Sequence, residues 1–532
     1  MGIGKSITRV DAYEKVTGGA KYTDDLRPAN CLVAKVVRST IANGLVKSFD
    51  LSEAEKVPGV VKIVTCFDSP QIQYPTPGHP WSVEPAHQDV ADRMLLNRRV
   101  RIYGDDIAAV VAEDEVAASR AARLIRVEYE EYPAVTTVEQ ALAPGAPVIH
   151  EERPDNLLAH SRFTIGEGDF DEIVKADPSL RVFEGEYDTQ AVQHCHIEVP
   201  VSYAYMEKGR VVVVSSTQIP HIVRRVCGQA LGIPWGKIRV IKPYIGGGFG
   251  NKQEVLYEPL NAFLTMQVGG RPVKIELSRE ETFSCTRTRH AIKFKLKTAV
   301  RPDGRLVARK FEAWSNQGGY ASHGHAIVAN ASNAYRHLYQ DEKVLDADAY
   351  TVYTNLPSGG AMRGYGIPQV DFAMEAHMDD IARGLGLDPV ELHEARLRRP
   401  GHRHHLLFER AARLHRKGQG AHPLGRKARG LPRPDRPRPA RGGHGALQLQ
   451  DGRLPDLARD GERAAHPQPG RLSAAPDGRD RDRPGRRHRL HPDGRRDDGH
   501  PAGGRPHRHG AGHRRGPLRH GRLRLPPDLC ER

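Results

Sequence analysis

The sequence is poor in cysteine and has no long apolar run. Its six cysteines among 532 residues form no Cys-x-x-Cys pair and show no regular spacing, which argues against a disulfide framework, an iron–sulfur site and a zinc finger. No run reaches the roughly 18 apolar residues that a membrane span needs. The start, MGIGKSITRVDAYEK, lacks the apolar core of a secretory signal. These absences predict a cytoplasmic protein.

A net positive charge is absent from the first three quarters of the chain. Residues 401–532 carry 32 Lys and Arg against 14 Asp and Glu, whereas residues 1–400 carry 48 against 51. The net charge of +15 therefore comes from the last 132 residues. A nucleic-acid-binding function inferred from the overall charge would depend entirely on that segment.

Residues 1–400 have the composition of a mixed α/β protein. Apolar runs rich in β-branched residues predict strands within 31–39, 59–66 and 105–114. Residues 115–132 begin with helical spacing and end as a strand, and the Pro/Gly-containing stretch 142–148 is typical of a linker. We therefore predict three regions: an N-terminal domain over 1–150, a second domain over 151–400, and an Arg-, Gly-, Pro- and His-rich tail over 401–532 that is expected to be disordered.

A strand, a helix, a strand and a glycine-rich loop follow one another over residues 210–252. The strands are predicted over 210–218 and 237–244, with the helix over 219–232 between them. Gln218 and the loop IGGGFGNK then both emerge at strand ends, where α/β sheets bind ligands. The glycines allow backbone N–H groups to approach an anion, or they form only a tight turn. The loop matches neither a dinucleotide fingerprint nor a Walker loop, and GIGKS near the start lacks the upstream glycine of a Walker loop.

Two further segments concentrate functional side chains. Arg363 lies among small residues in TNLPSGGAMRGYG, where a guanidinium suits an anion or an ordinary ion pair. The helix predicted after it places Phe372, Ala373, Ala376 and Ile381 on one face.

The cluster QHCHIE has the residue types of a metal site, with His194, Cys195, His196 and Glu198 as candidate ligands. The other interpretation is a structural role. Strand alternation separates Cys195 from the two histidines, so a packed, hydrogen-bonded role is favoured. For the segment SHGH at 322–325, a packed, hydrogen-bonded role is likewise favoured over a metal site.

Together these segments resemble the molybdenum-binding subunits of the xanthine oxidase family of molybdenum hydroxylases. The resemblance extends from about residue 8 to about residue 392 and preserves the order of several motifs. It implies an N-terminal hammerhead-like α/β domain followed by the first part of a molybdenum-cofactor-binding domain. The motifs that carry it are RVDAYEKVTGGAKYTDD, STQIP, GGGFGNKQE, LSREETFSCTRTRH, GGYASHGH, TNLPSGGAMRGYGIPQ and GLDPVEL.

The resemblance also implies roles for individual residues. Gln218 would lie near the apical side of molybdenum, Phe249 with Gly247 and Gly248 would line the metal site, and Arg363 would contact cofactor or substrate. Tyr365 would lie against a flat heteroaromatic substrate, and Gln253 takes the place of a substrate-facing glutamate in animal relatives. The arginine that those relatives supply before the Arg363 loop has no counterpart in 323–335, so purine recognition must differ in detail. The loop also lacks the cysteine of carbon monoxide dehydrogenases.

The activity implied is hydroxylation of purines such as hypoxanthine or xanthine. The cofactor would be molybdenum–molybdopterin, as the cytosine dinucleotide or a similar form. FAD and 2Fe–2S clusters would be on partner subunits, and no membrane partner is expected. The alternatives are a hydroxylase or reductase subunit for another N-heterocycle, an aldehyde or an aromatic CoA ester, and a non-enzymatic protein with a polycationic, nucleic-acid-binding tail.

The tail is predicted to be out of frame. It contains no Ile, Val, Thr, Tyr, Trp, Met or Asn, and only Phe408, Lys417, Lys427, Ser473 and Cys530 need codons that begin with A or T. A GC-rich gene read one base early gives this bias. Read one base later, 511–529 permits QDTDVDPFDTGAYASRQT, which resembles a family motif. We therefore expect a one-base frame change between Leu392 and His405. The general-base glutamate of a GExP-like motif is then missing, and the chain as written is expected to be inactive.

Overall fold

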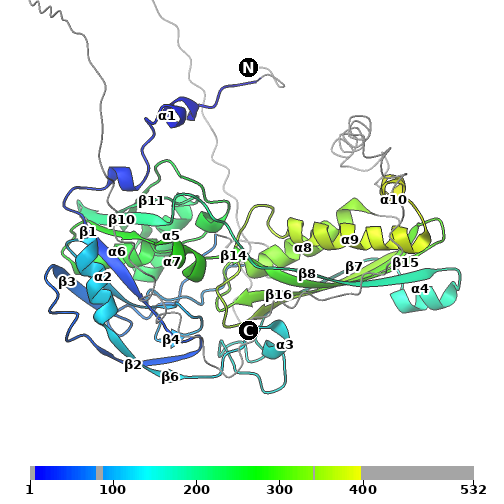
Figure 1. Cartoon of the computed structure of the whole chain (residues 1–532), viewed down its shortest axis with the longest axis horizontal. Helices are drawn as coiled ribbons and strands as arrows, with labels where there is room; N and C mark the ends of the chain where they lie inside the picture. The colour runs from blue at the N-terminus through cyan, green and yellow to red at the C-terminus, as the bar shows by residue number, and fades with distance from the viewer. Residues whose placement is uncertain (1–5, 79–87, 340–341, 397–532) are drawn as a thin grey trace, which may run out of the picture. The chain divides into compact units, whose positions relative to one another are not determined.

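A computed structural model describes residues 6–78, 88–339 and 342–396 (Figure 1). All described residues belong to one compact unit of the chain. The GIGK of the GIGKS motif and the predicted tail lie outside the described residues. No helix among the described residues is long and apolar enough to cross a membrane.

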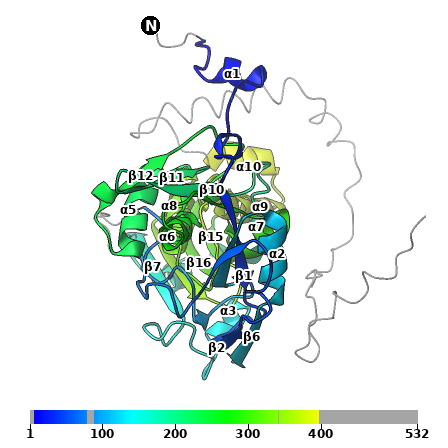
Figure 2. The same cartoon turned by 90° about the vertical axis from the view of Figure 1, so that its left-hand side faces the viewer.

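A seven-stranded sheet forms the larger of two main cores. Its strands are rich in Val, Ile and Ala, which suit a pleated surface that is covered by other elements. Helices α2 (Glu115–Leu124), α5 (Pro220–Leu231) and α6 (Glu258–Gln267) pack against it (Figure 2). In order across the sheet, the strands are β12 (Ile238–Ile241), β11 (Arg210–Ser215), β10 (Val201–Glu207), β13 (Val273–Glu276), β1 (Leu32–Arg38), β5 (Asp106–Ala112) and β3 (Val60–Thr65).

The strands predicted from apolar runs are confirmed as β1, β3 and β5. The predicted strand–helix–strand unit is also confirmed: β11 and β12 pair in parallel, and α5 connects them. Pro220 begins α5, and Gly232 ends it with a φ of 65° that a side chain would strain. Because β11 and β12 run in parallel, the segments that follow them leave the same edge of the sheet.

A small sheet covers part of the N-terminal region. Asp114 caps α2 by accepting a hydrogen bond from the Ala117 N–H, and the chain then continues into β6. The predicted change from helix to strand over 115–132 is therefore confirmed. The sheet consists of β4 (Arg99–Val100), β2 (Gly44–Asp50) and β6 (Arg126–Glu131).

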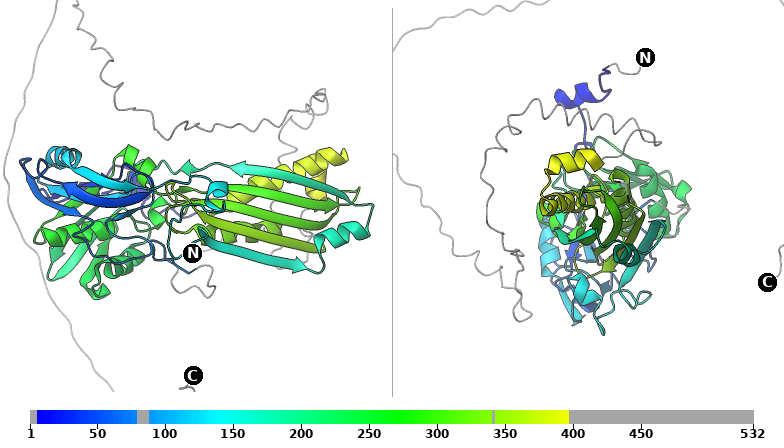
Figure 3. Two further views of the ribbon diagram at one scale, coloured as in Figure 1. Left: turned by 90° about the horizontal axis from the view of Figure 1, so that it is seen from below. Right: turned by 90° about the vertical axis from the view of Figure 1, so that its right-hand side faces the viewer.

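A five-stranded sheet forms the second main core. Helices α8 (Gly324–Leu338) and α9 (Ile367–Leu385) cross one of its faces (Figure 1), and its long strands run side by side (Figure 3). Charged cross-strand pairs line part of the sheet, with Lys295 3.4 Å from Glu186 and Lys297 2.9 Å from Glu184. In order, the strands are β7 (Leu157–Gly166), β17 (Val344–Tyr353), β16 (Leu306–Gly318), β15 (Ala291–Val300) and β8 (Arg181–Thr189).

Short elements complete the described part of the chain. Strands β9 and β14 pair to form a two-stranded ladder. Residues next to this ladder belong to the site described below. The short elements are α1 (Ala12–Val16), α3 (Val138–Ala141), α4 (Phe170–Ala176), α7 (Arg279–Cys285), α10 (Pro389–Arg396), β9 (Val192–Gln193) and β14 (Thr288–Arg289).

The predicted buried face of α9 is partly wrong. Ala373 and Ile381 are buried, but Phe372 is 53% exposed. The buried stripe runs through Val370, Met374, Met378 and its neighbours, and Phe372 lies on the opposite side of the helix. Local apolar spacing did not identify which side the five-stranded sheet would cover.

The predicted domain boundary near residue 150 stays a prediction. Strands β1, β3 and β5 come from before it, and β10 to β13 come from after it, yet all seven belong to one sheet. Strand β1 pairs in parallel with β13, which links Leu32 to Val273. The two regions of the sequence therefore share one core.

Asp92 is expected to make stability depend on pH. Burial raises the pKa of its carboxyl to about 6, while the Ala321 N–H and the Tyr353 hydroxyl donate to it. A carboxyl with a raised pKa stabilises the fold below its unfolded pKa near 4, and that contribution is lost as the pH rises through 6. Relative to Asp92→Asn, the wild-type free energy of unfolding should fall by roughly 2.5 kcal/mol between pH 4 and pH 7. Urea unfolding of both proteins across this range measures the difference, and parallel curves would contradict it.

Candidate functional site

The glycine-rich loop follows β12 and has an unusual backbone. Gly247, Phe249 and Gly250 have φ values of 98°, 51° and 111°, and a 3-10 turn over Asn251–Gln253 ends the loop. Positive φ is costly for phenylalanine, so the surrounding contacts must hold Phe249 in place. Its side chain is 49% exposed. The loop therefore presents an aromatic ring to solvent, while Gly248 and Gly250 on either side of it are buried.

Gln218 is attached to this loop at two points. Its N–H donates to the Lys252 carbonyl at 2.8 Å, and its Oε1 accepts from the Gly250 N–H at 3.1 Å. A Cβ at Gly248 would lie 2.4 Å from the same Oε1, so a side chain at this position would displace the Gln218 amide from its place beside the loop. The sequence-based prediction that Gln218 and the loop emerge together is confirmed.

The segment that contains Arg363 joins the site through its backbone. The Arg363 N–H donates to the Phe249 carbonyl at 2.9 Å, and Arg289 Nη2 donates to the Arg363 carbonyl at 2.7 Å. A Cβ at Gly250 would lie 2.4 Å from the Ala361 carbonyl oxygen. Arg363 is exposed and makes no ion pair with another described residue. The guanidinium is thus free to bind an anion, as one of the two interpretations of its sequence environment predicted.

Four of the predicted site residues are exposed around these contacts. Gln218 provides an amide, Phe249 a ring, Gln253 a second amide and Arg363 a cation. They come from three separate segments of the chain. The hydrogen bonds of Gln218, Phe249 and Gly250 described above hold these segments together. Such a surface suits a large polar ligand with anionic groups.

Tyr365 is held in place next to this surface. Its hydroxyl and His323 Nδ1 share a hydrogen bond of 2.8 Å, and the two rings meet edge to face with centroids 5.6 Å apart. The backbone φ is 49°, and the carbonyl accepts from Asn330 Nδ2 at 2.6 Å. Burial raises the pKa of the Tyr365 hydroxyl. The tyrosine is therefore a fixed, neutral ring.

Glu254 is the main functional residue that sequence reasoning missed. The side chain is fully buried and directly follows the predicted substrate residue Gln253. It accepts hydrogen bonds from Ser322 Oγ at 2.5 Å, Thr76 Oγ1 at 3.0 Å and the Ala361 N–H at 3.2 Å. Arg287 Nε lies 3.1 Å from Oε2. One carboxylate thus joins four segments beneath the exposed site.

Charge compensation explains how Glu254 stays ionised. Burial alone would raise the pKa of the carboxyl, but Arg287, His323 and the hydrogen bonds more than offset it and lower the pKa to about 2. The available sequence signal was an acidic residue directly after the glycine-rich loop. Its arginine partner is 33 residues away, and no local pattern connects the two.

The alternative metal site at QHCHIE is not assembled. His194 Nε2 bonds to the Ala361 carbonyl at 2.7 Å, and His196 Nε2 accepts from Asn251 Nδ2 at 3.0 Å. Glu198 pairs with the buried Lys252 at 2.6 Å. The favoured interpretation of packed, hydrogen-bonded side chains is confirmed, although its reasoning was wrong. Strand β9 ends at Gln193 and Cys195 has a φ of 52°, so these residues do not form an alternating strand.

The SHGH segment likewise serves contacts within the fold. Ser322 bonds to Glu254, His323 bonds to Tyr365, and His325 Nε2 lies 2.8 Å from the Gln88 carbonyl. Among the residues that the structure describes, no group of three or more His, Cys, Asp or Glu side chains is arranged to hold a metal ion.

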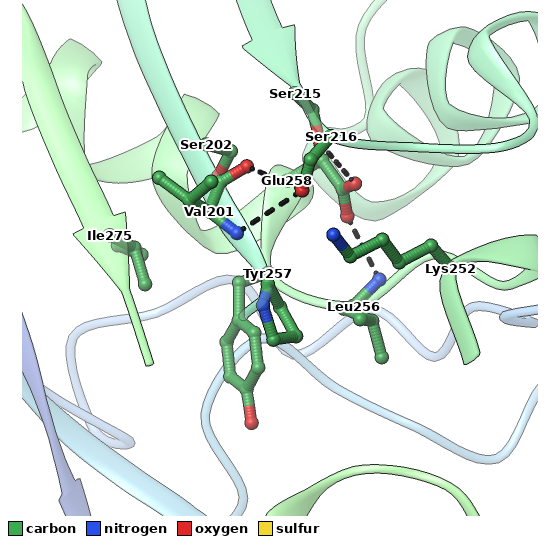
Figure 4. A pocket seen from close by; sticks show the side chains of 10 residues that line it. Val201, Ser202, Ser215, Ser216, Lys252, Leu256, Tyr257, Glu258 and Ile275 are labelled. Carbon is green, nitrogen blue, oxygen red and sulfur yellow. Dashed lines mark hydrogen bonds between the residues drawn. The ribbon is translucent and has the colours of Figure 1, made fainter. Parts of the chain in front are cut away.

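A small cavity lies behind Lys252 (Figure 4). Its volume is about 10 Å³, which is room for about one water molecule. Glu258 closes one side by accepting hydrogen bonds from Ser215 Oγ at 2.7 Å and from the Leu256 N–H at 2.9 Å. The cavity is too small for an organic substrate.

Two family models match the described domains. Residues 149–397 match the molybdopterin cofactor-binding domain, and residues 17–133 match the hammerhead domain of aldehyde oxidase and xanthine dehydrogenase. The chain is 50% identical to a putative xanthine dehydrogenase molybdenum-binding subunit of Escherichia coli K12 over 385 residues, which are 72% of this chain and 50% of that protein.

Other relatives agree with these matches. The nicotinate dehydrogenase large molybdopterin subunit of Eubacterium barkeri is 34% identical over 392 residues, which are 73% of this chain and 88% of that protein. The aldehyde oxidoreductase structure from Desulfovibrio gigas has a TM-score of 0.70 at 30% identity and covers 75% of this chain and 44% of that one.

The fold and the matches define a molybdopterin-binding protein. The chain belongs to the xanthine oxidase family of molybdenum hydroxylases. The predicted fold class, a hammerhead-like α/β domain with part of a molybdenum-cofactor-binding domain, is confirmed. The chain spans about half the length of the Escherichia coli relative.

Proposed function

We propose that this chain is the molybdopterin-binding subunit, or a part of it, of a multi-subunit xanthine dehydrogenase that hydroxylates purines such as hypoxanthine and xanthine. The observation that carries the proposal is the convergence of Gln218, Phe249 and Arg363 on one exposed surface of a molybdopterin-binding fold. The name and the 50% identity of the Escherichia coli relative support the purine class.

The residues present fit a large cofactor better than a bare ion. The exposed Gln218 amide and the exposed Arg363 guanidinium provide a hydrogen-bonding group and a positive charge, which suit a ligand with anionic groups. Gln218, Gly247, Gly248, Phe249 and Arg363 would hold the molybdenum cofactor, with Gln218, Phe249 and Arg363 closest to the metal. When bound, this cofactor supplies two-electron oxidation coupled to oxygen transfer.

Three side chains would position the substrate. The Arg363 guanidinium would bind an oxygen or ring nitrogen that carries negative charge, and the Gln253 amide would donate to or accept from the heterocycle. Tyr365, which His323 holds at 2.8 Å, would present a fixed ring to a flat substrate. A tyrosine that is already immobilised loses little side-chain entropy when the substrate binds.

The remaining parts of the enzyme would lie outside the described residues. A glutamate general base would come from the in-frame continuation of the gene, and FAD and 2Fe–2S clusters from partner subunits in the cytoplasm. A different N-heterocycle is the second candidate substrate, because the relative that this chain covers to 88% is a nicotinate dehydrogenase subunit.

A frame-corrected gene tests the proposal. We expect the corrected protein, purified with the products of its neighbouring genes, to contain molybdenum by mass spectrometry and to oxidise hypoxanthine or xanthine. Oxidation of nicotinate alone would favour the second candidate. A corrected protein that contains no molybdenum and oxidises neither class would overturn the family function.

Arg363 is expected to affect catalysis much more than cofactor content. In the corrected enzyme, Arg363→Met should lower kcat/KM for purines by about 100-fold, since a hydrogen bond from a charged donor to the substrate is worth up to about 3 kcal/mol. Molybdenum content should stay within twofold. Arg123→Met, on the exposed end of α2, is the control and should leave both values unchanged. Equal kinetic losses in the two variants would contradict the role of Arg363.

The reading frame gives a separate prediction. Resequencing the gene from codon 385 onward should reveal one gained or lost base between codons 392 and 405. The molybdopterin-domain match ends at residue 397, inside this interval. A confirmed frame, together with an intact cellular protein of 58.9 kDa, would contradict the prediction.

A further inference from the structure

A basic pocket lies along the outer edge of the seven-stranded sheet, apart from the glycine-rich loop surface. Strand β12 is the edge strand, and α5 and the start of β11 complete the walls. The pocket has a volume of about 560 Å³, which lies within the range of ligand sites of roughly 300–1,000 Å³. Its lining residues are Arg210, Pro220, His221, Arg224, Gly236, Ile238, Arg239, Val240 and Lys242.

The charge of this pocket is one-sided. Four of its nine lining residues are Arg or Lys, a fifth is His, and none is acidic. Residues 1–400 as a whole carry slightly more acidic than basic residues, 51 against 48. The concentration of cations is therefore local and does not follow from the composition of the domain.

Most of these cations are available to a ligand. Arg210, His221 and Lys242 are exposed and form no ion pair or side-chain hydrogen bond with another described residue. Arg239 Nη1 lies 3.6 Å from Glu207, a loose, exposed ion pair that contributes little. Arg224 Nε donates to the Trp235 carbonyl at 3.0 Å, which fixes its guanidinium and leaves its two terminal nitrogens uncommitted.

The position of α5 adds to the positive potential. Pro220 and His221 form its first turn, and the helix has no side-chain cap. The N-terminal end of a 12-residue helix carries a partial positive charge that favours anions. Cations on an edge strand also discourage pairing between sheets, but that explanation does not account for Arg210 on β11 or for Arg224 on α5.

We propose that this pocket binds a phosphate-bearing ligand of nucleotide size. Several guanidinium groups suit the tetrahedral oxygens of phosphate, and the volume exceeds what a single inorganic ion needs. The inference is independent of the proposed molybdenum function, because no lining residue belongs to the site around Gln218 and Arg363.

Titration of the full-length chain with ADP, inorganic pyrophosphate and adenosine tests the proposal. Fluorescence of Trp235, which adjoins Gly236, reports binding, and Trp235→Phe identifies its share of the signal from the three tryptophans. We expect ADP to bind more tightly than pyrophosphate, adenosine not to bind, and affinity to fall with salt.

Charge-removing variants show whether ADP binds in the pocket or to the polycationic residues 401–532. Arg239→Gln with Lys242→Gln should weaken ADP binding at least tenfold, about the effect of one lost charge-assisted hydrogen bond. The control pair Lys62→Gln with Arg123→Gln makes the same charge change at exposed positions elsewhere and should change affinity less than twofold. Equal effects of the two pairs, no effect of either, or displacement of ADP by an acidic peptide that binds more tightly would overturn the proposal.

Discussion

Replacing Gly250 by alanine is expected to separate the two loops of the candidate cofactor site. The new Cβ would lie 2.4 Å from the Ala361 carbonyl oxygen and 2.7 Å from its carbon, and the backbone φ of 111° is unfavourable for alanine. Because both contacts are with backbone, no side-chain rotation can relieve them. We expect a loss of about 2–4 kcal/mol in the free energy of unfolding. Urea unfolding of the full chain measures it.

Gly236→Ala is the matched control for this substitution. Gly236 has no atom within 4 Å of its Cβ position and no positive φ, so its substitution should change stability by no more than about 0.5 kcal/mol. In the frame-corrected protein, Gly250→Ala should also lose molybdenum, because the Arg363 N–H would no longer reach the Phe249 carbonyl. A stable Gly250→Ala protein with full molybdenum content would show that the close contact of the loops is not required.

Replacing Glu254 by glutamine is expected to destabilise the protein by about 3–5 kcal/mol. The substitution keeps the shape but leaves Arg287 buried without its counter-charge, 3.1 Å from a neutral amide. The amide nitrogen would also face donors that now bond to a carboxylate, namely Ser322 and Thr76. Chemical unfolding at pH 7 measures the loss.

Two comparisons isolate the charge of Glu254. Glu53→Gln breaks an exposed pair with Lys56 and should cost about 0.5 kcal/mol. Adding Arg287→Met to Glu254→Gln should recover part of the loss, since both buried charges are then gone. If Glu254→Gln costs no more than Glu53→Gln, the buried ion pair does not stabilise the loops.

The low pKa of Glu254 gives the sign of its pH dependence. The carboxyl is held ionised with a pKa of about 2, below its ordinary value of 4.5. The contribution of Glu254 to the free energy of unfolding is therefore present above pH 4.5 and is lost as the pH falls toward 2. The wild-type protein should lose stability over this acidic range, and Glu254→Gln should lose less.

The sequence by itself determined the elements that depend on local pattern. Apolar runs rich in β-branched residues predict β1, β3, β5, β11 and β12, because such side chains pack well on a pleated surface that is at least half buried. Two parallel strands joined by one helix must release their following segments at one edge, and this brought Gln218 to the glycine-rich loop before any coordinates were known. The composition of residues 401–532 was likewise readable without a structure.

Tertiary structure alone decided the contacts between distant segments. The partners of Glu254, the immobilisation of Tyr365 by His323, and the exposed side of Phe372 depend on which surfaces meet after the sheets form. The basic pocket also needed the fold, since Arg210, Arg224 and Arg239 are separated in the sequence and meet only where α5 and β12 lie together. Local sequence fixes backbone conformation, whereas pairing of buried charges and burial of one helix face are properties of the whole packed chain.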